Sequence, residues 1–306
     1  MLALLCGGQG LLSETMFDLA DGQPGTETIF ARAADLLGQD PRDLVRGGNH
    51  AGLLTNRTNQ ILAVCATLAT HACIVSALPD HLAVAGYSVG EMAAWAIAGV
   101  WTSQDALRLT DCRARAMDAA GGSEGQLGYI RGLARAAVEN LVRRNGCAIA
   151  IINPGKLFVI GGDRTAVAQA CEEAAASGAT RAGLLDVRIA SHTSTLSNAV
   201  EPFRQALVAT TWHDPDPRRK LISGGDGGWI HQTSPAIGEL AAHIAQPLDW
   251  AATLQSLGEL GTTRVLDLGP GHALADMARE ALPQARCHAA SAFRSIDGLR
   301  EWIGSS

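Results

Sequence analysis

A serine between glycines is the residue of this chain whose surroundings most suggest chemistry. Ser88 lies in the sequence GYSVGE, residues 86–91, between the apolar run Leu82–Gly86 and a stretch with helical periodicity. A G-x-S-x-G sequence between a strand and a helix is typical of a sharp turn that lifts the serine hydroxyl off the sheet. The backbone N–H groups that begin the helix then face any oxyanion formed beside the serine. The pattern predicts a nucleophile, and an ordinary strand–helix turn is the structural alternative.

A nucleophilic serine needs a base, and two of the nine histidines follow predicted strands. His192 lies in the sequence IASHT, residues 189–193, where a strand gives way to a helix. His272 directly follows the Gly-Pro-Gly sequence at 269–271, and Asp267 precedes it. Ser88, Asp267 and His272 occur in the chain order of the serine hydrolases. The residues alone therefore leave both histidines open as the base.

Further motifs, in their order along the chain, make it resemble one known family. They are GQG at 8–10, GYSVGE at 86–91 (similar to the family sequence G-H-S-x-G-E), Arg113, Ser191-His192, QPLDW at 246–250 (similar to N-P-V-x-W) and GPG at 269–271. This ordered set resembles the malonyl-CoA:acyl-carrier-protein transacylase family, which includes the acyltransferase domains of fatty-acid and polyketide synthases. The resemblance covers nearly the whole chain.

The resemblance implies a ping-pong mechanism at Ser88 and His192. In this family the serine attacks an acyl thioester, the histidine accepts its proton, and the acyl group then passes to the phosphopantetheine thiol of an acyl carrier protein. By position, the backbone N–H groups of Gln9 and Val89 would form the oxyanion hole, and Arg113 would bind the free carboxylate of a malonyl group. A guanidinium suits that role because it offers a carboxylate two parallel hydrogen bonds.

The resemblance also implies that a backbone carbonyl orients the histidine, so no acidic third member is expected. In the family this carbonyl comes from the segment before the late proline, here residues 242–246, which makes His243 and Gln246 candidates. Ser191, next to the histidine, and Asn153, in an Asn-Pro-Gly turn where the family lines its cleft, are further candidates. No permanently bound cofactor and no metal is expected, and malonyl-CoA is the expected substrate.

The chain departs from the family pattern near the expected site. Tyr87 replaces the usual histidine before the nucleophile, and Leu11 and Leu12 stand where a small residue and a second glutamine are usual. These departures favour a specialised member with a changed acyl or pantetheine channel. Val89 after the nucleophile and the small Ser191 are both consistent with a malonyl preference.

Several functions stay open at this point. The resemblance fits a fatty-acid enzyme, a stand-alone polyketide acyltransferase, or the malonyl-transfer subunit of a biotin-independent malonate decarboxylase, which would work in a multi-subunit complex. Transfer of a different or larger acyl group is one alternative. A serine hydrolase or thioesterase that uses Ser88, Asp267 and His272 is another, and a non-catalytic carrier-binding subunit is the third.

The elements that would position these residues follow an α/β pattern. Apolar runs at Leu2–Cys6, Leu82–Gly86, Lys220–Ser223 and Arg264–Leu268 predict buried strands. Helices are expected at about 26–37, 58–78, 91–98, from an N-cap at Ser103, and at about 195–209, 236–244 and 249–259. Strands that alternate with helices predict a mostly parallel sheet covered on both faces, with sites at the carboxyl ends of its strands.

A different pattern begins at the sequence GGSEG, residues 121–125. Strands are expected at 126–131, 147–152, 157–161 and 182–189, and helices at 133–145 and 163–177. This β-α-β-β-α-β order is that of a ferredoxin-like unit. The predicted division is a core of residues 1–122 and 191–306 with an insert at 123–190. The resembled family has the same plan, an α/β-hydrolase-like core with a ferredoxin-like insert.

The composition is that of a globular chain with a large core. Of 306 residues, 47% are hydrophobic and 18% are charged, which excludes disorder as the main state. The net charge of −6 makes duplex nucleic-acid binding unlikely without a local basic patch. All of the 24 basic residues except Lys156 and Lys220 are arginines, so composition singles out no arginine.

The cysteines and the apolar stretches indicate the cellular compartment of the protein. The seven cysteines are odd in number and form no C-x-x-C pair, which indicates free thiols in a reducing compartment. No charged segment precedes a hydrophobic run at the start of the chain, so no signal peptide is expected. Polar residues interrupt the longest apolar stretch, Ile61–Leu78, which favours a buried helix over a membrane span. A cytoplasmic protein without a membrane partner is the prediction.

Overall fold

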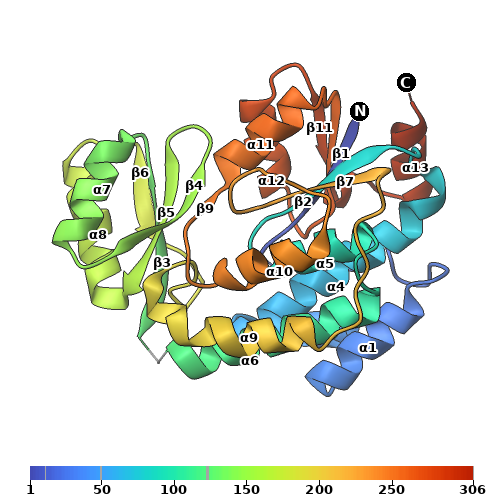
Figure 1. Cartoon of the computed structure of the whole chain (residues 1–306), viewed down its shortest axis with the longest axis horizontal. Helices are drawn as coiled ribbons and strands as arrows, with labels where there is room; N and C mark the ends of the chain where they lie inside the picture. Colours follow the sequence, from blue (N-terminus) through green and yellow to red (C-terminus); the bar gives the residue numbers. More distant parts are fainter. Residues whose placement is uncertain (11, 49, 122–123, 306) are drawn as a thin grey trace.

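A six-stranded sheet with the order β11-β10-β1-β2-β7-β8 forms the centre of the computed structural model, which describes residues 1–10, 12–48, 50–121 and 124–305 (Figure 1). The strands are β1 (Leu2–Cys6), β2 (Leu82–Gly86), β7 (Arg219–Ile222), β8 (Trp229–Ile230), β10 (Arg264–Asp267) and β11 (Arg286–Ala289). Every neighbouring pair is parallel except β7 and β8. The predicted mostly parallel sheet is confirmed, and the short edge strands β8 and β11 are additions to it.

Helices cover both faces of this sheet because its strands are apolar on both sides. In β1, Leu2, Leu4 and Cys6 pack into one hydrophobic cluster, whereas Ala3 and Leu5 pack into another. The first cluster is completed by α1 (Glu27–Leu37), α2 (Pro41–Arg46), α3 (His50–Leu53), α4 (Asn56–Ile74), α5 (Gly90–Ile97), α6 (Ser103–Gly121), α9 (Ser197–Val208), α10 (Thr233–Ala242) and α13 (Ile296–Gly304). The second cluster is completed by α11 (Trp250–Glu259) and α12 (Ala273–Ala281).

The predicted helix starts differ from the observed ones by up to three residues, and two of these differences involve a cap. Ser103 is the first residue of α6, and the N-cap is Thr102, whose hydroxyl accepts a hydrogen bond from the Asp105 nitrogen at 3.0 Å. The helix expected from residue 249 begins at Trp250, because Leu248–Asp249 forms a short strand, β9, and Asp249 caps the helix by accepting from the Ala252 nitrogen.

The segment Asn56–Ala77, which consists of α4 and a 3₁₀ turn, is long and apolar enough to cross a membrane by length and composition. Inside this structure 72% of its most apolar window is buried. It lies against α1, α5 and α6, as expected of the core helix that the sequence predicts.

A second sheet contains the strands of the predicted insert. Its order is β6-β3-β5-β4-β9, built from β3 (Gly125–Arg131), β4 (Ala148–Asn153), β5 (Leu157–Asp163) and β6 (Arg181–Leu184) together with β9. The first four follow the ferredoxin-like order. Helices α7 (Arg135–Arg144) and α8 (Arg164–Ala176) cover the side of this sheet that faces away from the core (Figure 1). The division itself stays a prediction, since its boundary at residues 122 and 123 lies outside the described residues.

The predicted strand 182–189 is too long, since β6 ends at Leu184. Beyond it the chain stays beside β3 irregularly: the Leu185 nitrogen donates to the Leu127 carbonyl and the Leu127 nitrogen to the Val187 carbonyl. The side chain of Gln126 also binds the carbonyls of residues 185 and 187, which interrupts the ladder. In addition, β9 pairs parallel with β4, so the QPLDW segment joins the second sheet to the core.

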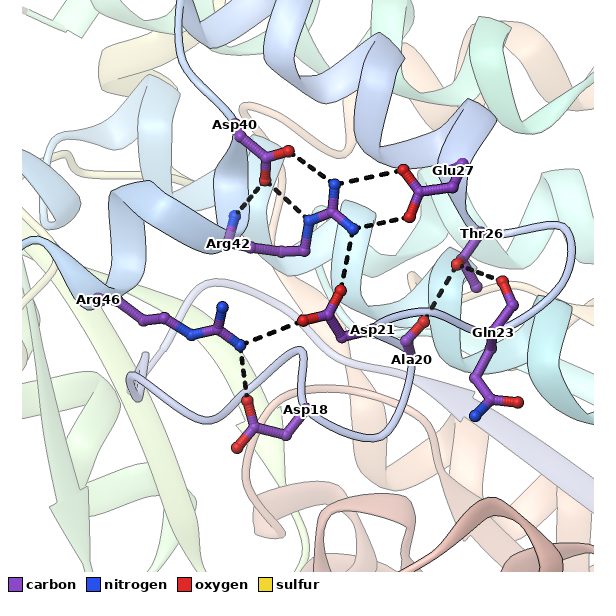
Figure 2. A network of polar contacts seen from close by, with 9 residues as sticks. All are labelled: Asp18, Ala20, Asp21, Gln23, Thr26, Glu27, Asp40, Arg42 and Arg46. Carbon is purple, nitrogen blue, oxygen red and sulfur yellow. Dashed lines mark hydrogen bonds and ion pairs between the residues drawn. The ribbon is translucent and has the colours of Figure 1, made fainter.

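An arginine cluster holds the chain between β1 and α1 (Figure 2). Arg42 binds three carboxylates, those of Asp21 at 2.9 Å, Glu27 at 2.7 Å and Asp40 at 2.7 Å, and its guanidinium lies 4.4 Å from the centre of the Phe30 ring. Arg46 binds Asp18 and Asp21 in the same cluster. We call this set the N-terminal arginine cluster. It fixes a segment whose described residues, 12–26, form turns and loops.

Candidate active site

Ser88 occupies a strained turn at the carboxyl end of β2. Its φ of 56° is in the left-handed region, which is unusual for a residue other than glycine. The two flanking glycines are required by space: a Cβ atom at Gly86 would lie 2.3 Å from the Glu91 nitrogen, and one at Gly90 would lie 2.1 Å from the Cys6 carbonyl oxygen. The turn therefore has the geometry that the G-x-S-x-G sequence predicts.

His192 is the histidine that reaches Ser88. The Ser88 Oγ lies 2.7 Å from His192 Nε2, and His192 Nδ1 donates to the His243 carbonyl oxygen at 2.5 Å. The His192 backbone nitrogen also donates to the Ile244 carbonyl at 2.7 Å, and its φ is 62°. Because Nδ1 carries the hydrogen, Nε2 is left as an acceptor for the serine proton.

The charge state of His192 suits a base. Burial is the main influence that lowers its pKa, to about 3, and the positive charge of Arg113 acts in the same direction. The side chain is 1% exposed. His192 is therefore neutral at physiological pH and able to accept a proton.

The alternative hydrolase triad is wrong. The carboxylate of Asp267 accepts hydrogen bonds from the backbone nitrogens of Gly269, Leu274 and Ala275, and so closes the turn between β10 and α12. Its burial is the main influence that raises its pKa, to about 7. His272 is exposed, and its Nδ1 lies 2.7 Å from the Asp276 carboxylate. Among the residues described, no hydrogen bond joins either side chain to Ser88.

The loop after β1 lies beside the nucleophile. A Cβ atom at Gly8 would lie 2.8 Å from the Tyr87 carbonyl oxygen and 3.6 Å from the Ser88 Cβ. Buried Asn59 of α4 holds the loop through two hydrogen bonds with the Gly10 backbone, both of 3.3 Å.

The backbone nitrogens of Gln9 and Val89 are the predicted oxyanion donors. Within the described part of the chain, neither donates to any acceptor. Two unpaired N–H groups beside a serine nucleophile are the arrangement that stabilises an oxyanion. The side chain of Gln9 points elsewhere, with its Nε2 3.4 Å from the Asn56 carbonyl oxygen.

Arg113 is a buried cation whose hydrogen bonds go to neutral groups. It is 3% exposed, and its Nη1 donates to the Gln60 Oε1 at 2.6 Å and to the Met117 sulfur at 3.1 Å. Among the residues described, no carboxylate forms an ion pair with it. Burial lowers its pKa to about 10, against the attraction of Glu91, so it stays charged at neutral pH.

Gln60 is a site residue that the sequence analysis missed. It is fully buried in α4, where its Nε2 donates to the Asn56 Oδ1 at 2.7 Å while its Oε1 accepts from Arg113. The signal was present, because Asn59 and Gln60 are two adjacent polar residues at the start of an apolar helix. Without the fold, nothing assigned their partners.

Asn153, the last residue of β4, lies near Tyr87, which follows β2. Asn153 is 3% exposed, and neither its Nδ2 nor its Oδ1 has a hydrogen-bond partner among the residues that the structure describes. The Tyr87 ring packs edge-on against Trp250, with ring centres 5.3 Å apart. Burial raises the pKa of Tyr87 to about 12; Asn153 is near enough to oppose this, although it makes no hydrogen bond of good geometry.

The remaining predicted residues differ in their surroundings. Ser191 is buried beside His192, whereas Gln246 is exposed. Leu12 is half-buried and packs against the core, and Leu11 lies outside the described residues. His243, predicted only as a candidate of the late segment, supplies its carbonyl to His192 and also pairs its imidazole with Glu91. No group of three potential metal ligands occurs among the residues described.

Comparison with known proteins agrees with this geometry. The family model of the acyl transferase domain matches residues 49–229. The malonyl CoA-acyl carrier protein transacylase of Mycobacterium bovis is 30% identical over 317 residues, which cover 98% of this chain and 99% of that protein.

Two solved structures are similar over nearly their whole length. The acyl-carrier-protein S-malonyltransferase of Burkholderia pseudomallei has a TM-score of 0.89 at 26% identity and covers 98% of this chain and 99% of its own. A malonyl-transacylase solved in complex with its type II polyketide-synthase acyl-carrier protein has the same TM-score, identity and coverage. The chain therefore belongs to the acyl transferase domain family, as a member of its malonyl-CoA:acyl-carrier-protein transacylase group, and is an acyltransferase.

Proposed function

We propose that this protein moves a malonyl group from CoA to the phosphopantetheine thiol of an acyl carrier protein, through a malonyl ester on Ser88. The single observation that carries the choice of acyl group is Arg113, a buried guanidinium with no carboxylate partner in the described residues. An unpaired buried charge is unfavourable, and a ligand carboxylate would complete it. The relatives named above support both the substrate and the carrier.

The first half-reaction uses the pair Ser88 and His192. His192 Nε2 takes the serine proton as Oγ bonds to the thioester carbon, and the carbonyl oxygen becomes an oxyanion between the N–H groups of Gln9 and Val89. The C–S bond then breaks, and CoA leaves as a thiol with the proton from His192. Malonyl-Ser88 and free CoA result.

The second half-reaction is the reverse with a different thiol. His192 takes the proton of the phosphopantetheine thiol, the sulfur attacks the ester carbon, and Ser88 leaves with that proton. The unpaired amide of Asn153 supports a role in binding a polar part of the thioester substrate, because a buried amide without partners is rare unless a ligand supplies them.

The setting of the reaction is part of the proposal. We place the protein in the cytoplasm, and the departures of its sequence at Tyr87 and Leu11-Leu12 favour a specialised pathway over general fatty-acid synthesis. A malonyl-transfer role within a malonate decarboxylase complex and a stand-alone polyketide acyltransferase are both compatible with this proposal. They differ in the carrier protein that accepts the malonyl group.

The test is acylation by a panel of CoA thioesters, followed by transfer to carrier proteins. Intact mass measurement should show one malonyl group on the wild-type protein after incubation with malonyl-CoA, and none on Ser88→Ala. Addition of a carrier with phosphopantetheine should remove the group, whereas the same carrier without it should not. Labelling of Ser88→Ala, or faster labelling by larger uncharged acyl groups, would contradict the proposal.

A further inference from the structure

His243 is linked to both halves of the Ser88–His192 pair. Its backbone carbonyl accepts the hydrogen bond from His192 Nδ1. Its imidazole Nδ1 lies 2.9 Å and 3.2 Å from the two carboxylate oxygens of Glu91. Glu91 belongs to the first turn of α5, the helix that follows Ser88 directly. One residue thus joins the carbonyl partner of the base to the helix of the nucleophile.

The His243–Glu91 pair is enclosed. The two side chains are 13% and 4% exposed. The Gly224 nitrogen donates to Glu91 Oε1 at 3.3 Å, and a Cβ atom at Gly225 would lie 2.2 Å from His243 Nε2. The backbone of residues 224 and 225 therefore fixes the imidazole with Nδ1 toward the carboxylate.

Three nearby carboxylates affect the pKa of the His243 imidazole. Burial disfavours its charged form, but Glu91 of α5, Asp226 of the loop after β7 and Glu239 of α10 together outweigh burial and raise the pKa of His243. Next to it lies His192, whose pKa is lowered by burial, by the positive charge of Arg113 and, more weakly, by that of His243, whereas the hydrogen bond to the His243 carbonyl raises it. The charged form of His243 therefore opposes a second positive charge on His192.

We infer that the His243–Glu91 pair sets how readily His192 accepts the Ser88 proton, by holding the carbonyl of residue 243 in place and by opposing positive charge on His192. This inference rests on the Ser88–His192 pair of the proposed function and makes His243 a positioning residue. It does not depend on the identity of the acyl group or the carrier.

A pH dependence with a definite sign follows. His192 becomes an imidazolium as Ser88 attacks, and charged His243 disfavours that state. Above the raised pKa of His243 the opposing charge is gone, although the neutral ring still donates from Nδ1 to Glu91. The reactivity of Ser88 should therefore rise about three- to tenfold as His243 loses its proton, which corresponds to a coupling of about half to one pKa unit between the two imidazoles.

The experiment measures sulfonylation of Ser88 by phenylmethanesulfonyl fluoride between pH 6 and 9.5. In this step the Ser88 oxygen bonds to sulfur, fluoride leaves, and the serine proton passes to His192 and then to solvent. Intact mass reports the rate, and Ser88→Ala gives the background. The wild type should show the rise, with the same midpoint as the His243 ring in an NMR titration.

Two variants should change the pH profile of Ser88 sulfonylation in different ways. His243→Gln keeps a side chain that can donate to Glu91 but cannot titrate, so its profile should be flat where the wild type rises. Glu91→Gln removes the carboxylate that favours charged His243, so its midpoint should move to lower pH. A residue with a purely structural role would change the height of the profile and leave its shape unchanged.

The contradicting outcomes are equally definite. Parallel profiles for wild type and His243→Gln, or no labelling of wild-type Ser88, would overturn the inference. If His243→Gln does not fold, Glu91→Gln decides, and an unshifted midpoint overturns it. Because the reagent replaces both acyl donor and carrier, failure of malonyl-CoA to acylate Ser88 would contradict the proposed substrate and leave this inference standing.

Discussion

Two arginines in different regions of the molecule show opposite solutions to the same electrostatic problem. Arg42 in the N-terminal arginine cluster binds three carboxylates and stacks on Phe30 (Figure 2). Arg113 is more deeply buried, at 3% exposure, and its hydrogen bonds go to the neutral Gln60 and Met117. A satisfied charge stabilises a local structure, whereas an unsatisfied buried charge is available to a ligand.

The same contrast applies to the polar groups in the two regions. In the N-terminal arginine cluster, the carboxylates of Asp18, Asp21 and Asp40 each accept a hydrogen bond from Arg42 or Arg46 (Figure 2). Around Ser88, the Asn153 amide has no partner, and the N–H groups of Gln9 and Val89 have no acceptor in the described residues. We therefore expect changes in the first region to affect the fold alone and changes in the second to affect mainly the reaction.

The largest effect is expected from His192→Ala. Loss of the base should lower the rate of Ser88 acylation by about 10⁶-fold, as for the base histidine of a serine protease, with a small change in melting temperature. Rapid-quench measurement of malonyl-Ser88 formation gives the rate. His272→Ala is the matched control and should retain wild-type activity, because its ring pairs with exposed Asp276. Equal loss in both variants would remove the distinction between the two histidines.

The next effect is on stability, from Arg42→Ala. Removal of the guanidinium leaves three carboxylates close together and frees the loop before α1, which should lower the free energy of unfolding by about 2 kcal/mol. Urea denaturation measures this, and Ser88 acylation should be unchanged. Arg46→Ala, with more exposed ion pairs, should have a smaller effect. A stable Arg42→Ala protein that has lost activity would show that the cluster is not separate from the site.

A smaller effect is expected from Asn153→Leu. The variant keeps the volume and removes an amide that has no partner, so the free energy of unfolding should stay within about 1 kcal/mol of wild type. The rate of malonyl transfer should fall about five- to tenfold, by the loss of one substrate hydrogen bond. Substantial destabilisation with normal transfer would place Asn153 with the structural residues.

The smallest effect is expected on the pH dependence of the stability that the N-terminal arginine cluster contributes. The hydrogen bond from Arg42 is the main influence that lowers the pKa of Asp40. The stability that this contributes is present above the ordinary aspartate value, about 3.9, and is lost as pH falls through the lower folded value. The difference in melting temperature between wild type and Arg42→Ala should therefore be constant above about pH 5 and shrink below pH 4. A difference that grows on acidification would have the wrong sign.

The elements that carry the nucleophile were predictable because their signals are local. The apolar runs Leu2–Cys6 and Leu82–Gly86 form the predicted strands, and the glycines at 86 and 90 leave no space for a side chain. Thr102 took the capping role expected of Ser103, a shift of one residue that capping preferences do not resolve. Short strands such as β8 and β9 were missed because their pairing depends on the fold around them.

The partners of the site residues were not predictable from spacing. The residues alone left His192 and His272 open, and only the family resemblance selected His192, which lies 2.7 Å from the serine. Gln60 beside Arg113 and Glu91 beside His243 are contacts between segments far apart in the chain. Such contacts depend on how the helices and sheets pack against one another. From the sequence alone these residues could be described only as polar residues in apolar helices, without partners.

The most direct test of carboxylate recognition compares malonyl-CoA with acetyl-CoA as acyl donors for wild type, Arg113→Ala and Arg113→Lys. With Arg113→Ala, formation of malonyl-Ser88 should fall about 10³-fold while formation of acetyl-Ser88 is unchanged or increases, because acetyl has no carboxylate to pair. Arg113→Lys should recover part of the malonyl rate, since it keeps the charge without the paired donors. An equal loss for malonyl and acetyl in Arg113→Ala would contradict the assignment of this buried arginine to the substrate carboxylate.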